Sequence, residues 1–144
     1  MSVYQQINSF LVDIFGRINK IEERALAAGL DAEVSVTEIH ILEKVGDMGS
    51  GRMSDIARAL GITLATLTVA CERLQNKDLI SRVRAEHDRR VVLVSLTPKG
   101  EAAYQYHRQF HHDLISSILS GLSDDEEKAL SRALQKIEKF LSEY

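Results

Sequence analysis

The 144-residue chain has one cysteine, one proline and no tryptophan. A lone cysteine forms no internal disulfide, so a disulfide-stabilised scaffold is excluded. No apolar run approaches the roughly 18 residues needed to cross a bilayer, and the N-terminus has no signal-peptide core. Both absences predict a cytoplasmic protein that does not use a membrane as partner. A hydrophobic content of 44% with 27% charged residues predicts a folded globular chain rather than a disordered one.

Charge is unevenly distributed, although the whole chain carries a net charge of only −3. The stretch from Arg52 to Arg90 holds 8 basic and 5 acidic residues, a net of +3. The remainder holds 10 basic and 16 acidic residues, a net of −6. A basic stretch within an acidic chain is typical of a protein that meets phosphate groups with one part of its surface.

The N-terminal third is predicted to be helical. Apolar residues recur at three- and four-residue spacing over 7–26, which predicts a long amphipathic helix. Ser35 and Glu38 form a capping-box pair, so a second helix is expected from Ser35 to about Val45. Three glycines are expected to end this helix, because glycine is a poor helix former: Gly46, Gly49 and Gly51.

The middle of the chain predicts a helical pair followed by a β-hairpin. Helices are expected over 54–60 and 63–77, with Gly61 supplying the left-handed turn between them. The spacing of apolar residues then changes from a helical to a strand pattern. Apolar and polar side chains alternate over 80–84, residues 91–96 are mostly apolar and β-branched, and a polar segment joins the two stretches. This order of elements predicts a winged helix-turn-helix.

Two further helices are predicted at the C-terminus. Thr97 and Pro98 open the first, and Gly121 ends it. Ser123 and Glu126 form a second capping box, which starts the last helix. The fold class is therefore α+β, mostly α.

The second helix of the pair is expected to enter the major groove of DNA, where threonine offers a hydroxyl and a methyl to base edges. Its outward-facing residues are Thr63, Ala65, Thr66, Thr68, Val69 and Arg73. The hairpin is expected to contact phosphate or the minor groove through Arg82, Arg84, Arg89 and Arg90. Asp88 is expected to pair with a neighbouring arginine and shape the turn, which leaves another guanidinium available. A plain helical pair with solvated threonines is the structural alternative.

Asp88, Arg89 and Arg90, followed by Leu96, Thr97 and Gly100, resemble the wing signature of the MarR family of bacterial transcriptional regulators. The resemblance covers the whole chain and implies a homodimer whose first and last two helices intertwine. It divides one compact domain into an N-terminal dimerisation helix (1–32), a DNA-binding region (33–97) and C-terminal dimerisation helices (98–144). A two-fold dimer implies double-stranded palindromic DNA as partner, with half-sites about one helical turn apart.

Two subgroups of the family are similar beyond the wing, and they imply different effectors. Stretches such as Ile7 to Phe15, Val34 to His40 and His107 to His112 resemble the repressor of fatty-acid synthesis genes. That subgroup uses a long acyl chain on acyl carrier protein as co-repressor, and we expect this protein to require no cofactor in that case. An acyl chain needs an apolar tunnel. We expect it near four apolar residues of the predicted helices: Phe10, Ile14, Ile39 and Phe110.

The second subgroup is the zinc-uptake repressor, whose glutamate and three histidines correspond to Glu23, His40, His107 and His111. His107 and His111 are four residues apart, so they share one helical face and suit a single metal ion. The subgroup's second-site cysteine is missing, and Glu22 lies closer than Glu23 to the apolar stripe of its helix. The structural alternative is that the histidines hydrogen-bond carboxylates and support the dimer core. Lipid and zinc both remain open at this point.

Enzymatic readings have little support in the sequence. It contains no phosphate-binding loop and no nucleophile elbow, and Cys71 falls on the inner face of its predicted helix as a small core residue. We therefore predict a DNA-binding regulator that is not an enzyme. A helical protein-interaction module is the alternative class.

Overall fold

The computed structural model describes residues 1–30 and 33–144. Their contacts group the chain into two compact units, Met1–Arg108 and Gln109–Tyr144. The boundary between these units falls inside a helix, whereas the sequence pattern divides the chain at 32/33 and 97/98. The functional three-part division stays a prediction.

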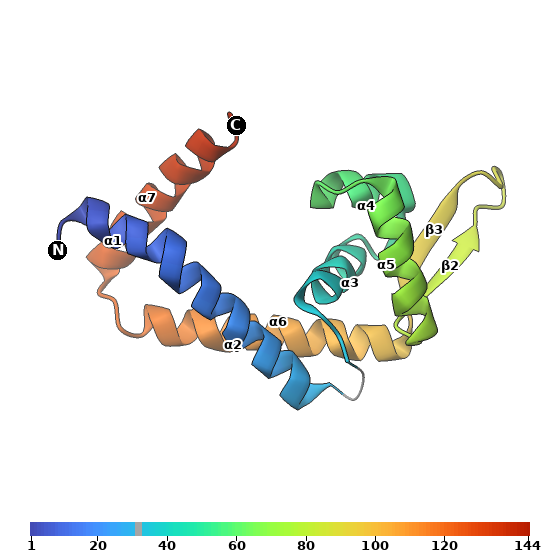
Figure 1. Ribbon diagram of the computed structural model, residues 1–144, viewed down its shortest axis with the longest axis horizontal. Helices are drawn as coiled ribbons and strands as arrows, with labels where there is room; N and C mark the ends of the chain where they lie inside the picture. Colours follow the sequence, from blue (N-terminus) through green and yellow to red (C-terminus); the bar gives the residue numbers. More distant parts are fainter. Residues whose placement is uncertain (31–32) are drawn as a thin grey trace. The chain divides into compact units, whose positions relative to one another are not determined.

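The N-terminal helix is longer than its apolar spacing predicts. It consists of α1 (Val3–Ser9), a π-helical segment η1 (Phe10–Ile14) and α2 (Phe15–Gly29) in direct succession (Figure 1). Large apolar side chains along α1 and η1 are exposed, including Phe10 at 48% and Leu11 at 65%. Leu26 in α2 is buried, so only the last turns of this helical run join the core.

Three helices and three strands follow (Figure 1), of which the sequence predicts the helices and the two strands of the hairpin. Its elements are α3 (Val36–Met48), β1 (Ser50–Arg52), α4 (Met53–Leu60), α5 (Leu64–Asn76), β2 (Ile80–Arg84) and β3 (Val92–Leu96). The strands form one antiparallel sheet in the order β1-β3-β2, with Arg82 opposite Val94 and Gly51 opposite the same valine from the other side. The strand β1 was not predicted, because three residues with a central glycine carry no alternation of apolar and polar side chains.

Local side-chain bonds explain where the helices begin and end. Ser35 and Glu38 form the predicted capping box of α3, and Thr63 caps α5 by accepting a hydrogen bond from the Thr66 backbone N–H at 3.1 Å. Gly61 has a φ of +66°, the left-handed conformation that ends α4 and sets the turn to α5.

Gly46 does not end α3, contrary to the prediction. It lies inside the helix, which runs to Met48, and Gly49 with a φ of +72° forms the cap. A Cβ at Gly46 would lie 2.8 Å from ring atoms of Tyr104. This glycine is therefore explained by the close approach of an aromatic ring and not by a break in the helix.

The core of the first unit lies between the sheet and the helices α2 to α5. Its fully buried side chains include Ile39, Ile41, Leu42, Val45, Ile56, Leu67, Cys71, Leu74, Leu79, Ile80 and Val94. Burial of side chains from every element of the helix-turn-helix is the main source of the stability that holds α5 in place.

The chain ends in two helices, α6 (Pro98–Leu119) and α7 (Asp124–Leu141). Thr97 caps α6 by accepting from the Gly100 N–H at 3.0 Å, and its own hydroxyl donates to the Asp78 carbonyl at 2.6 Å. A Cβ at Gly100 would lie 1.8 Å from the Leu79 carbonyl oxygen, so only glycine lets α6 start this close to the turn after α5.

The second unit exposes apolar side chains on α7. Leu134 is 55% exposed, Ile137 49% and Phe140 57%.

Among the described residues, no single helix combines the length and hydropathy of a membrane span. Only α4 and α5 meet the criterion as a pair, and they are bent by 109° at the turn between them.

Candidate functional site

The outer face of α5 carries the residues that the sequence predicts for base contact. Thr63, Thr66 and Val69 are exposed and Thr68 is half-buried, while Leu67, Cys71 and Leu74 are fully buried on the inner face. The remaining two predicted contacts, Ala65 and Arg73, are also exposed. The predicted division of α5 into an inner and an outer face is therefore observed, and its contact with bases stays a prediction.

The threonine hydroxyls of α5 are partly engaged within the helix. The hydroxyls of Thr63 and Thr66 lie 2.9 Å apart, and the Thr68 hydroxyl donates to the Leu64 carbonyl at 2.8 Å. A hydroxyl that donates one bond still has lone pairs to accept another. These side chains are thus held in defined positions and can still accept a hydrogen bond from a base.

The tip of the hairpin is organised by Asp88, as expected. Its carboxylate accepts hydrogen bonds from the Arg90 backbone N–H at 3.0 Å, from Arg90 Nε at 3.1 Å and from Arg90 Nη2 at 3.2 Å. The hydrogen bonds from the Arg90 side chain and backbone hold the pKa of the Asp88 carboxyl below its usual range. Asp88 is therefore ionised at neutral pH and holds the turn closed.

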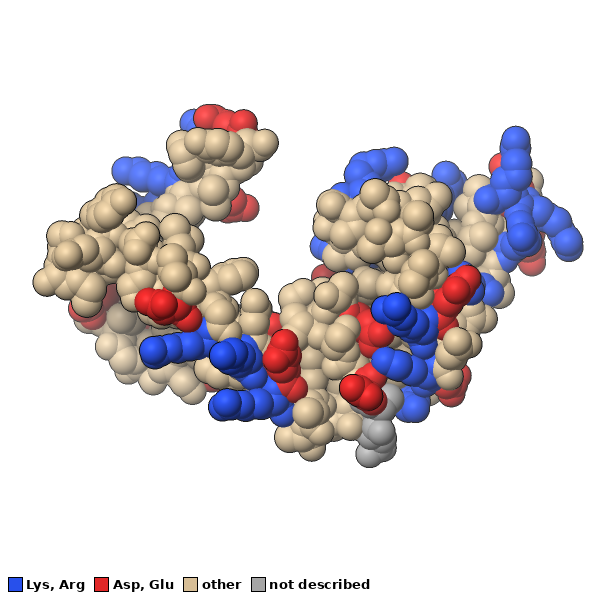
Figure 2. Space-filling view, in the orientation of Figure 1, with Lys and Arg blue, Asp and Glu red and all other residues tan. Residues whose placement is uncertain are grey.

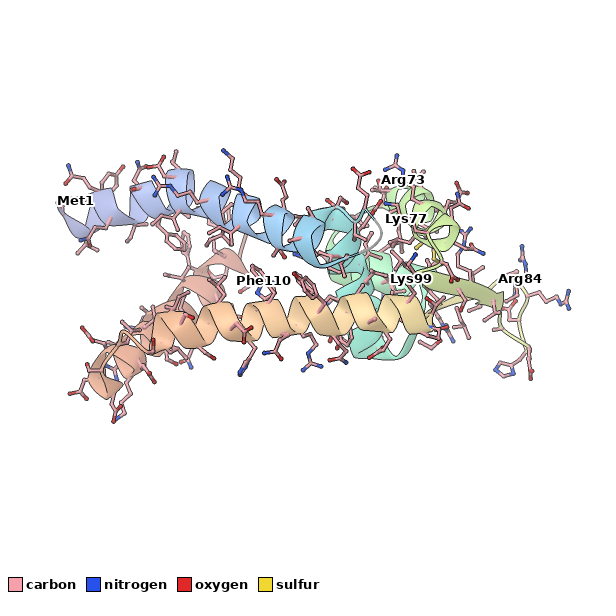
Figure 3. All side chains as sticks on the ribbon, turned by 90° about the horizontal axis from the view of Figure 1, so that it is seen from below. Met1, Arg73, Lys77, Arg84, Lys99 and Phe110 are labelled. Carbon is pink, nitrogen blue, oxygen red and sulfur yellow. The ribbon has the colours of Figure 1, made fainter. Side chains whose placement is uncertain are left out.

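The other wing arginines are placed differently. Arg84 donates from Nη1 to the Arg89 carbonyl at 2.6 Å, which braces the two ends of the turn. The Arg89 side chain is exposed and has no partner among residues 1–30 and 33–144. Figure 2 shows the atoms of basic side chains gathered at the hairpin, and Figure 3 shows Arg84 there and Arg73 on α5. Arg89 is thus the guanidinium that the pairing of Asp88 leaves available.

A groove of about 320 Å³ lies between α5 and the hairpin. Thr68 of α5 and Arg82 and Arg90 of the hairpin line it, together with Arg52 and Ser54 from the start of α4. The helix α5, which we call the recognition helix, and the hairpin of β2 and β3, which we call the wing, therefore enclose one basic groove.

Two contributors to this groove were missed from the sequence. Arg52 is positioned by β1, the strand that sequence reasoning did not find, and its charge contributes to lowering the pKa of Asp88. Gln75 accepts a hydrogen bond from Arg82 Nε at 2.7 Å and so fixes this arginine beside α5. The positive net charge of the stretch from Arg52 to Arg90 was the only sequence signal for Arg52. No sequence signal pointed to Gln75.

A buried carboxylate joins two of the predicted metal-ligating histidines. Oε1 of Glu22 accepts from Nε2 of His107 at 2.5 Å and from Nε2 of His40 at 3.1 Å. Glu43 lies 3.5 Å from Nδ1 of His107, and His40, Glu43 and His107 bring their ligand atoms within 4.8 Å of one another. This histidine cluster, Glu22, His40, Glu43 and His107, connects α2, α3 and α6.

The structure places Glu22, and not Glu23, in this cluster. Glu22 is 3% exposed, whereas Glu23 is on the exposed face of α2. The family pattern misplaced the residue by one position, and the helical wheel had already favoured Glu22 because of its position beside the apolar stripe. His111 follows His107 by four residues on α6 and is half-buried.

The charge state of Glu22 follows from its hydrogen bonds. Burial by itself raises the pKa of the Glu22 carboxyl, but the hydrogen bonds and charges of His107 and His40 together outweigh burial and lower it. The carboxylate is thus ionised at neutral pH. An ionised carboxylate with imidazole nitrogens is a donor set that suits zinc.

The four apolar residues predicted for an effector tunnel occupy different environments. Ile39 is fully buried and fills the core, whereas Phe10 and Ile14 are 48% and 40% exposed on η1. Phe110 is half-buried and belongs to the second unit. Within the first unit, an apolar cavity of about 250 Å³ lies instead among Leu30, Val34, Leu79, Ala103 and Tyr106.

Cys71 is fully buried in the core, as predicted. Burial raises the pKa of its thiol to about 11. It is therefore a protonated core residue at neutral pH.

Comparison with known proteins agrees with this geometry. Residues 34–92 match the MarR family. The transcriptional regulator ZitR of Lactococcus lactis is 32% identical and covers 93% of this chain and 94% of its own. The multiple antibiotic resistance protein MarR of Salmonella typhimurium is 30% identical over 83% of this chain and 85% of its own.

A solved structure shares both the fold and a substantial part of the sequence. Streptococcus pneumoniae FabT in complex with DNA superimposes with a TM-score of 0.91 at 34% identity, covering 97% of this chain and 98% of that one. Identity above 30% over nearly the full length, together with a winged helix-turn-helix that presents one exposed helix face and an arginine-bearing hairpin, places this chain in the MarR family of DNA-binding transcriptional regulators.

Proposed function

We propose that this protein is a repressor that binds palindromic duplex DNA as a homodimer and responds to a lipid effector. The observation that carries the DNA part of the proposal is the basic groove between α5 and the hairpin. An exposed helix beside arginines suits major-groove reading with backbone or minor-groove contacts at its flank. A helical protein-interaction module would not need this arrangement of arginines.

Exposed apolar surface supports the homodimer. Leu11 in η1 and Leu134 and Phe140 in α7 are each more than half exposed in the single chain. Large apolar side chains exposed along a helix mark an interaction surface. A second copy of the chain would cover these helices and place two recognition helices one turn of DNA apart, about 34–36 Å.

The proposed effector is a long acyl chain on acyl carrier protein, acting as co-repressor on fatty-acid biosynthesis genes. The similarity to FabT supports this choice, since it extends over the whole chain and includes the N-terminal and C-terminal helices outside the DNA-binding region. No enzymatic step is required, because the effector would act only by binding one state of the dimer more tightly than another.

A gel shift on the protein's own promoter tests the proposal, with a scrambled duplex of equal length as control. We expect specific binding that tightens with long-chain acyl carrier protein and is unchanged by carrier protein without an acyl chain. Equal affinity for the operator and the scrambled duplex would reject specific DNA binding, and an acyl-independent shift would reject the lipid response.

A zinc-responsive repressor of metal-uptake genes is the second candidate, and the histidine cluster favours it. One carboxylate oxygen of Glu22 already lies at hydrogen-bond distance from both His40 and His107. The Glu43 carboxylate lies beside His107. These residues, with His111 from the next turn of α6, would hold the ion. Bound zinc would replace the hydrogen bonds of Glu22 and tie α2, α3 and α6 together.

Zinc titration separates the two candidates. If zinc is the effector, we expect uptake of about one ion per chain and loss of uptake in His107→Ala. His87→Ala is the matched control, because His87 is exposed in the wing and outside the cluster. Tight uptake with a zinc-dependent gel shift would reject the lipid proposal, and an unaltered shift with zinc and with chelator would reject zinc.

A further inference from the structure

The first two turns of the recognition helix expose apolar side chains. Leu64 is 51% exposed and Val69 is 50% exposed, and Ala65 is exposed as well. Between Thr63 and Cys71 the sequence contains no charged side chain and no side-chain amide. The outer surface of these two turns therefore consists of apolar side chains, threonine methyl groups and threonine hydroxyls.

The threonine hydroxyls of this surface use most of their hydrogens within the helix. The Thr68 hydroxyl donates to the Leu64 carbonyl at 2.8 Å. The hydroxyls of Thr63 and Thr66 lie 2.9 Å apart, so one of them donates to the other. A single hydroxyl hydrogen is then left for a base, whereas the oxygens of Thr66 and Thr68 keep lone pairs that accept hydrogen bonds. The surface thus offers methyl groups and acceptors but few donors.

The base pairs of the major groove differ in what they require from such a surface. Guanine presents two acceptors, N7 and O6, and is read by donors such as the side chains of arginine and lysine. Thymine presents its C5 methyl group, which is read by apolar contact, and its adenine partner presents the N6 amino group as a donor. A surface of methyl groups and accepting oxygens therefore matches an A·T pair and lacks the donors that guanine requires.

The apolar surface lies beside cations that suit DNA as its partner. Leu64 and Thr68 line the groove of about 320 Å³ together with Arg52, Arg82 and Arg90. Guanidinium groups bind the phosphates of the DNA backbone, and these contacts position a protein without reading the sequence. The charge complementarity of the groove argues that duplex DNA covers the exposed apolar side chains. Base edges are then the part of the DNA that these side chains meet.

We propose that the recognition helix reads its operator through the C5 methyl groups of thymines, which contact Leu64, Ala65 and Val69 in the major groove. Recognition helices contact bases with their N-terminal residues, and these three residues lie in the first two turns of α5. The inference rests on the proposed DNA-binding function and adds to it the chemical group that is read. Specificity at these positions comes from apolar contact, and not from hydrogen bonds to guanine.

Replacement of thymidine by deoxyuridine tests the proposal, because uracil pairs like thymine but lacks the C5 methyl group. Promoter duplexes that contain either nucleotide throughout are titrated with the full chain by fluorescence anisotropy. Burial of one methyl group corresponds to about a fourfold change in affinity, so the deoxyuridine duplex should bind about sixteenfold more weakly if each half-site of a palindrome provides one contacted thymine. A scrambled duplex of the same composition should bind equally with either nucleotide.

Two variants remove the protein side of the same contacts. Val69→Ala and Leu64→Ala should each weaken binding to the thymidine operator severalfold and should have a much smaller effect on the deoxyuridine operator, because the partner methyl group is already absent. Alanine favours the helix at both positions, and thermal melting checks that the fold is retained. Val83→Ala is the matched control, because Val83 is 58% exposed on β2 of the wing. Its effect should be the same on both operators.

Failure of methyl recognition and failure of the proposed function give different results. Equal affinities for the thymidine and deoxyuridine operators, both tighter than for the scrambled duplex, would overturn methyl recognition and retain specific DNA binding. Equal affinities for the thymidine operator and the thymidine scrambled duplex would reject the proposed function itself. A deoxyuridine effect of parental size in both Val69→Ala and Leu64→Ala would overturn the assignment of the contacts to α5.

Discussion

The side-chain oxygen of Gln75, in the last turn of α5, accepts a 2.7 Å hydrogen bond from Nε of Arg82 in β2. Arg82 also lines the groove between the recognition helix and the hairpin, with Thr68 opposite. A neutral amide fixes the guanidinium without cancelling its charge. The recognition helix and the wing are therefore connected at the position where both would face DNA.

Gln75→Ala should reduce operator affinity by about 1 kcal/mol, about fivefold, because Arg82 loses its fixed orientation. The melting temperature should change little, because Gln75 is exposed. Fluorescence anisotropy with a labelled operator measures the effect, and Asn76→Ala, at the exposed neighbouring position, is the control. Equal affinities for the two variants would show that the Gln75–Arg82 bond does not orient the wing.

Arg89→Ala should lower the slope of log affinity against log salt by about 0.9, the value for one neutralised phosphate. Arg90→Ala should also weaken binding but lower the slope less, because Asp88 already offsets part of the Arg90 charge. Both dimers should remain folded, since exposed tip residues contribute little to stability. Lys136→Ala on α7 removes a charge outside the basic stretch and serves as control. Parental slopes in both arginine variants would exclude the wing from the interface.

Leu134→Asp should dissociate or misfold the dimer, because it places a carboxylate on the apolar stripe of α7 that a second copy would bury. Light scattering gives the oligomeric state, and thermal melting reports the fold. Gln135→Asp adds the same charge on the opposite side of α7 and should leave the dimer intact. An intact Leu134→Asp dimer would place the interface on other helices.

Cys71 should resist thiol reagents in the native protein. Burial raises its pKa to about 11, so at pH 8 only about one thiol in a thousand is ionised, and the reactive form is the thiolate. The raised pKa also means that stability should fall as the pH rises through the unfolded-state pKa of roughly 8.5, because the unfolded thiol ionises first. Ellman's reagent should react slowly at pH 8 and fully in denaturant. Fast native labelling would place Cys71 outside the core.

Asp78 adopts a φ of +58°, the left-handed conformation that non-glycine residues rarely occupy. Its side chain is exposed, so Asp78→Gly removes strain without removing core packing and should stabilise the protein by about 0.5–1 kcal/mol. Asp78→Val should destabilise it, because a branched Cβ fits this conformation worst. Urea unfolding compares the three proteins. The reverse order of stability would show that the turn changes conformation rather than bearing strain.

The sequence was sufficient to predict a structural feature wherever the residues that cause it lie within a few positions of one another. The Ser35–Glu38 capping box, the Thr63 cap and the left-handed Gly61 each specify a helix end through groups within a few residues. The division of α5 into buried and exposed faces follows from helical periodicity alone. The Asp88–Arg90 turn is equally local, since both partners lie within three residues.

Contacts between distant segments were decided only by the tertiary structure. The strand β1 exists because β3 offers it backbone partners, and Gly46 stays helical because Tyr104, 58 residues later in the sequence, needs the space of its missing side chain. Neither requirement is visible in the local sequence. The same holds for Gln75, whose partner Arg82 is brought to it by the turn between α5 and β2.

The choice between Glu22 and Glu23 shows most clearly which features follow from the sequence and which depend on tertiary packing. The sequence by itself determined that a glutamate pair precedes His40 and that His107 and His111 share one helical face. The helical wheel favoured Glu22 for the buried face, and only the packing of α2 against α3 and α6 decided that its carboxylate meets His40 and His107. Adjacent helical residues point about 100° apart, so a one-residue difference that hardly alters a sequence pattern moves a carboxylate from a buried cluster to the surface.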